Sequence, residues 1–151
     1  MAVKLIASDL DGTLLTNKKE LSPRTREALD LAAAQGIYLV PATGRSFESV
    51  PEMIREYPGV EYLITANGGA VYSVSEKKRI YQCLMTSESV EAAIAVRKRE
   101  KMVMEVVIDG VPYAEEDYVR DPLSYLATEY GARYIKATRT PVKDIIEFAT
   151  Q

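Results

Sequence analysis

The chain has 151 residues, a formal net charge of -3, no histidine and a single cysteine. Without histidine, Ser-His and Cys-His nucleophile systems and histidine-bound zinc are excluded, so any chemistry falls to carboxylates, lysines, tyrosines or a metal ion. The acidic balance excludes a basic surface for nucleic acid, and no apolar run approaches the roughly 18 residues of a membrane span. We expect a cytoplasmic protein with no nucleic-acid or membrane partner, in which Cys83 is a buried, reduced thiol.

The first part of the chain predicts strands that alternate with helices. Apolar runs mark the strands, and the first run is typical of a strand buried on both faces. Pro23 is typical of the first position of a helix, and Gly36 of the position that ends one. The alternation indicates right-handed crossovers and a parallel sheet with helices on its faces. The expected strands span residues 3–10, 37–40 and 62–66, and the expected helices span residues 22–36 and 46–57.

After residue 69 the pattern changes to hairpins and helices. Two pairs of short strands flank polar turns, and the segments between and after them have helical spacing. We expect hairpins at 70–74 with 79–84 and at 104–108 with 111–114, and helices at 86–101, 122–130 and 142–149. A domain boundary is therefore placed near Leu84, so that a parallel α/β part, residues 1–84, precedes an α+β part, residues 85–151.

Polar residues and glycines follow each of the three expected parallel strands. The carboxyl ends of such strands meet at one edge of a sheet, about 4.8 Å apart, where open α/β sheets bind ligands. A carboxylate there can act as a nucleophile, a second can shuttle a proton, and both can hold a divalent cation. The three groups are Asp9-Leu10-Asp11-Gly12-Thr13, Thr43-Gly44-Arg45 and Asn67-Gly68-Gly69.

Each group also has an ordinary structural interpretation, which the sequence leaves open. The Asp-Gly pair at 11–12 is typical of a turn and the Asn-Gly pair at 67–68 of a hairpin. Thr43 could cap the following helix, and Arg45 could be solvated. An EF-hand calcium loop starting at the first aspartate is a rival, but its sixth position must turn sharply and is Leu14 here.

Three segments together resemble the haloacid dehalogenase superfamily of phosphohydrolases, and specifically its Cof-like branch. They are Asp-Leu-Asp-Gly-Thr-Leu-Leu at 9–15, Ala-Thr-Gly-Arg-Ser at 42–46 and Thr-Ala-Asn-Gly-Gly-Ala-Val-Tyr at 65–72. The resemblance implies a Rossmann-like core, of which residues 1–84 are the N-terminal half. It also implies that residues 85–151 are similar to the α+β cap domain that this branch inserts after the third strand.

The resemblance also implies a site and a reaction. Asp9 resembles the nucleophile that forms an aspartyl-phosphate, and Asp11 the acid that protonates the leaving oxygen and then activates water. The Asp9 carboxylate and the Asp11 main-chain carbonyl would bind Mg²⁺, and the Thr43 hydroxyl would hold the transferring group. The substrate would be a small phosphorylated metabolite such as a sugar phosphate. Backbone amides near Leu10 to Gly12 would help bind the phosphate oxygens. Further residues implied at the phosphate and substrate are Thr13, Gly44, Arg45, Asn67 and Gly68.

Departures from the family pattern predict an incomplete site. The family has a lysine after the cap and then a Gly-Asp signature with further acidic residues, and neither is found here. Asp117 and Asp121 have a similar mutual spacing, but Glu116 replaces the glycine, and we expect residues 115–117 to be a solvated turn. We expect the chain to stop inside the cap, to be a catalytically incomplete fragment on its own, and to self-associate through the unpaired edge of its first strand.

Two other kinds of protein remain alternatives. A non-enzymatic member of the superfamily would keep the fold without completing the site. A phosphoacceptor signalling domain is also a parallel α/β sheet with an acidic pair after its first strand, but it places its acceptor aspartate after the third strand, where this chain has Asn67.

Overall fold

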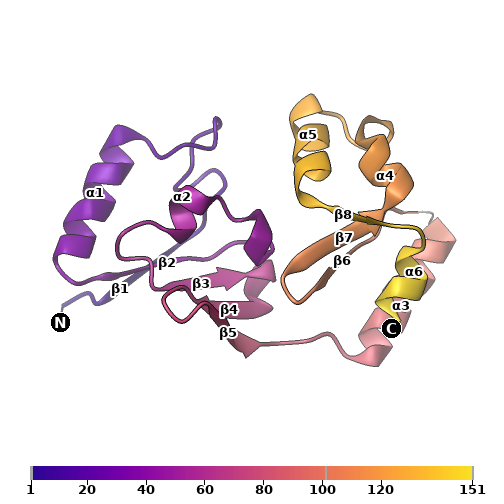
Figure 1. Cartoon of the computed structure of the whole chain (residues 1–151), viewed down its shortest axis with the longest axis horizontal. Helices are drawn as coiled ribbons and strands as arrows, with labels where there is room; N and C mark the ends of the chain where they lie inside the picture. The colour runs from indigo at the N-terminus through magenta and orange to yellow at the C-terminus, as the bar shows by residue number, and fades with distance from the viewer. Residues whose placement is uncertain (1, 101, 151) are drawn as a thin grey trace. The chain divides into compact units, whose positions relative to one another are not determined.

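The computed structural model describes residues 2–100 and 102–150, and the chain divides into two compact units, Met1–Cys83 and Leu84–Gln151. In the first unit loops and helices separate the first three strands, and α1 lies against β2 (Figure 1). Its elements are β1 (Leu5–Ser8), α1 (Pro23–Ala34), β2 (Tyr38–Pro41), η1 (Phe47–Ser49), α2 (Glu52–Arg55), β3 (Tyr62–Thr65), η2 (Ala66–Gly68), β4 (Ala70–Ser73) and β5 (Lys78–Gln82).

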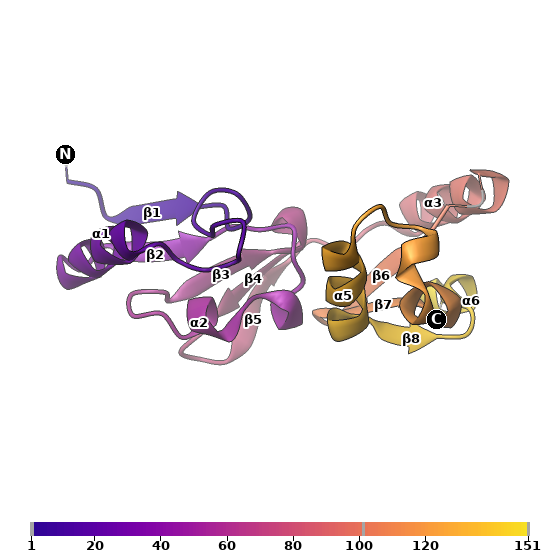
Figure 2. The ribbon, with the colours of Figure 1, turned by 90° about the horizontal axis from the view of Figure 1, so that it is seen from above.

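The sheet of the first unit is parallel across β1, β2 and β3, as the alternating pattern predicts. β1 runs parallel to β2 with Ile6 opposite Leu39, and the Ala42 amide continues the pairing by donating to the Ser8 carbonyl at 2.9 Å. β3 lies on the other side of β2, where the Thr43 amide donates to the Ile64 carbonyl at 2.9 Å. The chain then turns back through the antiparallel strands β4 and β5, which confirms the expected hairpin (Figure 2).

Helix α1 begins and ends where the sequence predicts. The Ser22 hydroxyl oxygen accepts the Thr25 amide at 3.1 Å, and Pro23 occupies the first helical turn. Gly36 has a φ of 71°, the left-handed conformation in which glycine ends helices without strain. The two ends of α1 are therefore explained by the residues next to them in the sequence.

The core of this unit holds the loop after β1 in place. Leu10 is completely buried, and Leu15 and Leu21 of the same loop are also buried, so the polar residues between them are carried on an anchored backbone. The core cluster comprises Leu10, Leu15, Leu21, Ala32, Leu39, Val50, Ile54, Tyr57, Leu63 and Tyr72.

Two expectations about burial are wrong. β1 is shorter than residues 3–10 and is not buried on both faces, since Leu5 keeps 50% and Ile6 keeps 38% of its accessible surface. The reason is that among the described residues β1 pairs only with β2, which makes it an edge strand. Cys83 is exposed rather than buried, because it follows β5, which is also an edge strand.

The helix expected over residues 46–57 is broken in two. Val50 leaves the helical conformation with a ψ of 128°, and Pro51 follows in front of α2. A proline disfavours the helical conformation in the residue before it, because its ring clashes with that residue's backbone. The apolar spacing of the segment is correct for burial of Val50 and Ile54, but η1 and α2 are separate elements.

The second unit is an α+β fold built on a three-stranded sheet. β6 and β7 form the expected hairpin through Asp109 and Gly110, whose φ values are 51° and 86°, and β8 adds in parallel to β7. Its core contains Ala114, Tyr118 and Ile135. The elements are α3 (Ser87–Glu100), β6 (Glu105–Ile108), β7 (Val111–Glu115), α4 (Glu116–Arg120), η3 (Pro122–Ser124), α5 (Glu129–Thr138), β8 (Thr140–Val142) and α6 (Ile145–Ala149).

Helix α3 agrees with the expected helix at 86–101, whose last residue lies outside the described residues. None of the helices in the described parts of the chain is long and apolar enough to cross a bilayer.

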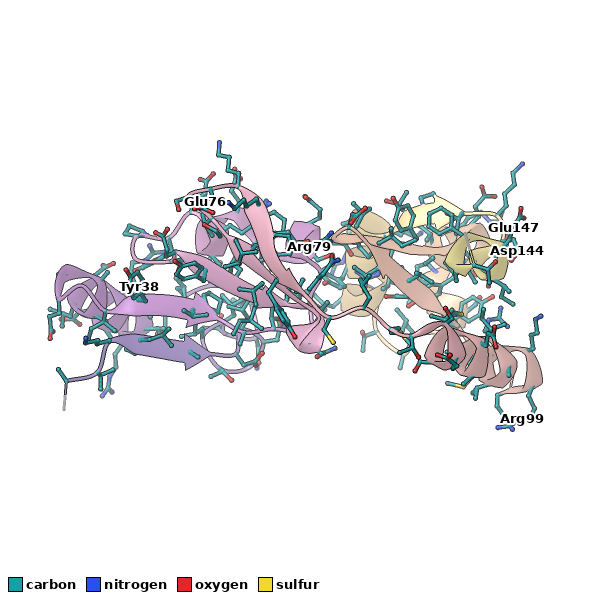
Figure 3. The ribbon with its side chains drawn as sticks, turned by 90° about the horizontal axis from the view of Figure 1, so that it is seen from below. Tyr38, Glu76, Arg79, Arg99, Asp144 and Glu147 are labelled. Atoms are coloured by element: carbon teal, nitrogen blue, oxygen red, sulfur yellow. The ribbon has the colours of Figure 1, made fainter. Side chains whose placement is uncertain are left out.

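The expected helices at 122–130 and 142–149 are wrong in extent. The Thr128 hydroxyl oxygen accepts the Gly131 amide, so α5 begins after Thr128 and buries Ala132 and Ile135 on one side. α6 begins after Asp144, which Figure 3 labels beside Glu147. The Asp144 carboxylate accepts the amides of residues 146 and 147. The turn expected at 115–117 is instead the end of β7 and the start of α4, although Asp117 is exposed.

Candidate active site

Three loops follow the carboxyl ends of β1, β2 and β3, and backbone hydrogen bonds join the second loop to the third. The Arg45 carbonyl accepts the Ala66 amide at 2.8 Å, and the Thr43 carbonyl accepts the Asn67 amide at 3.2 Å. The two loops are therefore held in one piece by main-chain atoms.

The first loop leaves β1 with Asp9 exposed at its start. The Leu15 amide donates to the Leu10 carbonyl at 2.8 Å, and Gly12 has a φ of 86°, which L-residues adopt only with strain. The Asp9 carboxylate accepts a hydrogen bond of 3.3 Å from the Thr13 hydroxyl. That bond is long and therefore weak, so the carboxylate stays accessible to a ligand.

Asp11 is clamped between two cations. The Arg45 guanidinium donates to both of its carboxylate oxygens, from Nε at 2.7 Å and from Nη2 at 2.8 Å. The Lys19 ammonium donates to Oδ1 at 2.7 Å. Arg45 is itself fixed by a third bond, from Nη1 to the Ser49 carbonyl at 2.8 Å. Two parallel hydrogen bonds from one guanidinium to one carboxylate, here called the fork, are directional. The fork therefore fixes the first loop relative to the second.

The clamp determines the charge of Asp11. The hydrogen bonds from Arg45 hold the pKa of its carboxyl well below the usual range; partial burial opposes this shift and Lys19 adds to it. Asp11 is therefore ionised at neutral pH, which is the form that can accept a proton.

Thr43 and Gly44 complete the second loop. Thr43 is almost fully buried, and its hydroxyl oxygen accepts the Arg45 amide at 3.2 Å, so its own hydrogen can be donated to a ligand oxygen. A Cβ on Gly44 would lie 2.7 Å from Oδ1 of Asn67, so the glycine lets this carboxamide approach the loop closely.

The structural interpretations that the sequence left open have different outcomes. Asn67 and Gly68 do form a tight turn, with φ values of 54° and 91°, between β3 and β4. Arg45 is not solvated, since only 11% of its side chain is exposed. Thr43 does not cap the next helix, because Ser46 occupies that position.

Sequence reasoning missed Lys19 and Ser49. The Leu10 side chain lies in the core, which is compatible with the expectation that the main chain of Leu10, and not its side chain, faces a ligand. No sequence pattern separates Lys19 from its neighbour Lys18, and the Ser49 carbonyl is a backbone group. Asp117 belongs to the second unit, where it pairs with Arg120.

Residues 6–150 match the family model of the haloacid dehalogenase-like hydrolases. The chain belongs to this family. The HMP-PP phosphatase of Klebsiella pneumoniae (strain 342) is 34% identical over 107 residues, which are 71% of this chain and 39% of that protein. The family expected from the motifs is thus confirmed.

Solved structures of haloacid dehalogenase-like proteins share the fold. A haloacid dehalogenase-like hydrolase from Bacteroides thetaiotaomicron has a TM-score of 0.70 at 26% identity, covering 97% of this chain and 54% of that chain. A sugar phosphatase of haloacid dehalogenase subclass IIB has a TM-score of 0.77, covering 98% and 55%, and at 20% identity this likeness shows the fold alone. The chain therefore spans about half the length of these solved relatives.

The Mg²⁺ implied by the hydrolase resemblance fits the residues only in part. The described residues contain no group of three or more acidic, histidine or cysteine side chains that could hold a metal ion. Mg²⁺ often takes only one or two protein carboxylates and completes its shell with water and phosphate oxygens. The accessible Asp9 carboxylate and the Asp11 main-chain carbonyl suit such a weak site, whereas the Asp11 carboxylate is occupied by Arg45 and Lys19.

Proposed function

We propose that the chain carries the nucleophile half of a Mg²⁺-dependent phosphatase site that acts through an aspartyl-phosphate. The observation that carries this proposal is the accessible Asp9 carboxylate at the end of β1, next to an Asp11 that Arg45 ties to the loop of Thr43. One carboxylate is left open to attack, and the second is held in place beside it.

In the first step an Asp9 carboxylate oxygen attacks phosphorus, and the bond from phosphorus to the ester oxygen breaks in line. The leaving oxygen takes a proton from the acid form of Asp11, and the Thr43 hydroxyl and the amides near Leu10 to Gly12 hold the phosphoryl oxygens. The clamp disfavours this acid form, so the pair with Arg45 has to loosen when the substrate binds.

In the second step water attacks the phosphorus of phospho-Asp9 and the acyl-phosphate bond breaks, which restores the Asp9 carboxylate and releases phosphate. The ionised Asp11 takes the proton of the attacking water, and the lowered pKa of Asp11 favours this form. Mg²⁺, held by the Asp9 carboxylate and the Asp11 carbonyl oxygen, would neutralise charge on the phosphoryl oxygens.

Small phosphorylated metabolites such as sugar phosphates are the proposed substrates. Support comes from the names of two relatives, one an HMP-PP phosphatase and one a sugar phosphatase. We assign residues 1–84 to the core and residues 85–151 to a cap that selects the substrate, and we place the protein in the cytoplasm. Gly44, Arg45, Asn67 and Gly68 are the proposed substrate-side residues of the core.

The alternative function is a catalytically incomplete or non-enzymatic member of the family. It is favoured by the partial metal site, in which the Asp11 carboxylate is occupied by Arg45 and Lys19. A phosphoacceptor signalling domain is not supported, because Asn67 with a positive φ stands after β3. We therefore expect the 151-residue chain to bind Mg²⁺ weakly and to turn over slowly.

Hydrolysis of p-nitrophenyl phosphate with Mg²⁺ tests the proposal. Asp9→Asn should abolish turnover because the nucleophile is lost, and Asp11→Asn should lower it by about 10²-fold or more because proton transfer is lost. Asp117→Asn, an exposed change in the second unit, should have no effect. Asp9→Asn activity equal to that of the parent would contradict the assignment, and robust activity of the parent would show that other residues complete the site.

A further inference from the structure

Lys19 lies outside every motif that points to the site, yet its ammonium reaches the site. Its Nζ is 2.7 Å from Oδ1 of Asp11, and 29% of the side chain is exposed. The neighbouring Lys18 is exposed. The two adjacent lysines therefore differ in burial and in contact with Asp11. The conformation of the loop that carries them accounts for this difference.

The loop that carries Lys19 is closed by its own hydrogen bonds. Leu15 bridges Leu21 in antiparallel fashion, and both are buried, which anchors the base of the loop. At the tip, the Thr16 amide donates to the Glu20 carbonyl at 2.9 Å and the Lys19 amide donates to the Thr16 carbonyl at 2.8 Å.

The backbone of Lys19 itself is in an uncommon conformation. Its φ is 62°, in the left-handed region, where residues other than glycine are found uncommonly and usually for a structural or functional reason. The loop thus accepts a mildly strained residue at the position whose side chain reaches Asp11.

The charges at this edge balance only when Lys19 is counted. Asp9 and Asp11 supply two negative charges, and Arg45 and Lys19 supply two positive charges. In the absence of bound Mg²⁺, removing Lys19 would leave these side chains with one net negative charge, which would repel a phosphate dianion. Arg45 alone cannot offset both carboxylates, because it carries one positive charge against two negative charges, and its guanidinium is directed at Asp11.

We propose that Lys19 is a positioning residue of the phosphate site, which shares the Asp11 carboxylate with Arg45 and keeps the edge neutral for a phosphate dianion. This inference rests on the proposed function and extends it to a residue outside the family motifs. When Arg45 turns toward a bound phosphate, Lys19 keeps Asp11 in place.

Binding of inorganic phosphate to the 151-residue chain, followed by titration calorimetry, tests this role. In Mg²⁺-free buffer, Lys19→Met should weaken phosphate binding by at least about fivefold, the effect of one unit charge on another at about 4 Å in water. Lys19→Arg should restore binding to within about twofold, and Lys18→Met should leave it unchanged. The ¹³C shift of the Asp11 carboxyl should move in Lys19→Met and not in Lys18→Met, which reports the contact between Lys19 and Asp11 in solution, while the rescue of phosphate binding by Lys19→Arg separates a role of the positive charge from a purely structural role in the loop.

The outcomes separate this inference from the function on which it rests. Phosphate binding by Lys19→Met equal to that of the parent, or no rescue by Lys19→Arg, would overturn the role of Lys19 and leave the phosphatase proposal standing. No phosphate binding by the parent would overturn the proposed phosphate site itself. Lys19→Gln provides a second neutral variant, and circular dichroism of each variant establishes that it is folded.

Discussion

Asp11 shows how strongly single residues depend on their neighbours at this site. Its carboxylate accepts two hydrogen bonds from Arg45 and one from Lys19, so protonating it would break three charged contacts. The same contacts that fix the side chain also resist its use as an acid. A bound phosphate competes for Arg45, the main cause of the lowered pKa of Asp11, and we expect the substrate itself to restore the ability of Asp11 to donate a proton.

The lowered pKa of Asp11 predicts how stability depends on pH. A carboxyl whose pKa is lower in the folded state stabilises the fold fully above its ordinary pKa of about 3.9, and this contribution is lost as the pH falls through the lowered value. Arg45→Gln should therefore raise the pKa of Asp11 and shift acid unfolding to higher pH. A ¹³C NMR titration of the carboxyl groups in metal-free buffer measures this.

Arg24→Gln provides the matched control for that titration, because Arg24 is an exposed residue of α1. It should leave the Asp11 titration unchanged. An Asp11 pKa that is the same in Arg45→Gln as in the parent would show that the fork does not control the charge of this carboxyl.

At the level of elements, the ends of α1 and the strand order of the first unit follow from the sequence pattern, whereas the exposed strand edges do not. Ser22 and Gly36 bound α1 as predicted, because caps depend on a few adjacent residues. The break at Pro51 was readable in principle, but the apolar spacing around it favoured one helix. The exposure of β1 could not be read from its sequence, since burial depends on partners elsewhere in the fold.

For the candidate site, the sequence predicted which loops carry the polar residues but not which side chains contact one another. The strand ends and motifs located Asp9, Asp11 and Thr43 at one edge, because parallel strands bring their carboxyl ends together. The partners of Asp11 were not predictable, since Lys19 reaches it through a loop conformation and Ser49 contributes only a carbonyl to the network.

The cap of α1 gives a prediction about stability. Ser22→Ala removes the oxygen that accepts the Thr25 amide and should lower the free energy of unfolding by about 1 kcal/mol. Ser22→Asn keeps a capping oxygen and should retain most of the stability. Urea denaturation of both variants measures this, and equal losses in the two would indicate that the hydroxyl does not act as a cap.

For the molecule as a whole, the open edge of β1 is the feature with the largest consequence. Among the described residues β1 has one neighbour, β2, and its apolar Leu5 is half exposed. An unpaired apolar strand edge can pair with another chain. We expect a second copy of this chain to cover it.

Light scattering at increasing concentration tests this expectation. The parent should self-associate, and Leu5→Lys should reduce association, because a charged edge residue opposes strand pairing. Leu123→Lys alters an equally exposed leucine of the second unit and should have no effect. A parent that stays monomeric, or the same loss of association in both variants, would show that the β1 edge is not the contact.

Formation of a beryllofluoride adduct tests the central claim, that Asp9 is the nucleophile, most directly. Beryllofluoride bonds to a reactive aspartate and mimics its phosphorylated form, so the measurement does not need a complete catalytic cycle. With Mg²⁺ in excess, ¹⁹F NMR should show a bound resonance for the parent and for Asp117→Asn, and none for Asp9→Asn. A bound resonance that persists in Asp9→Asn, or none in the parent, would contradict the assignment of Asp9.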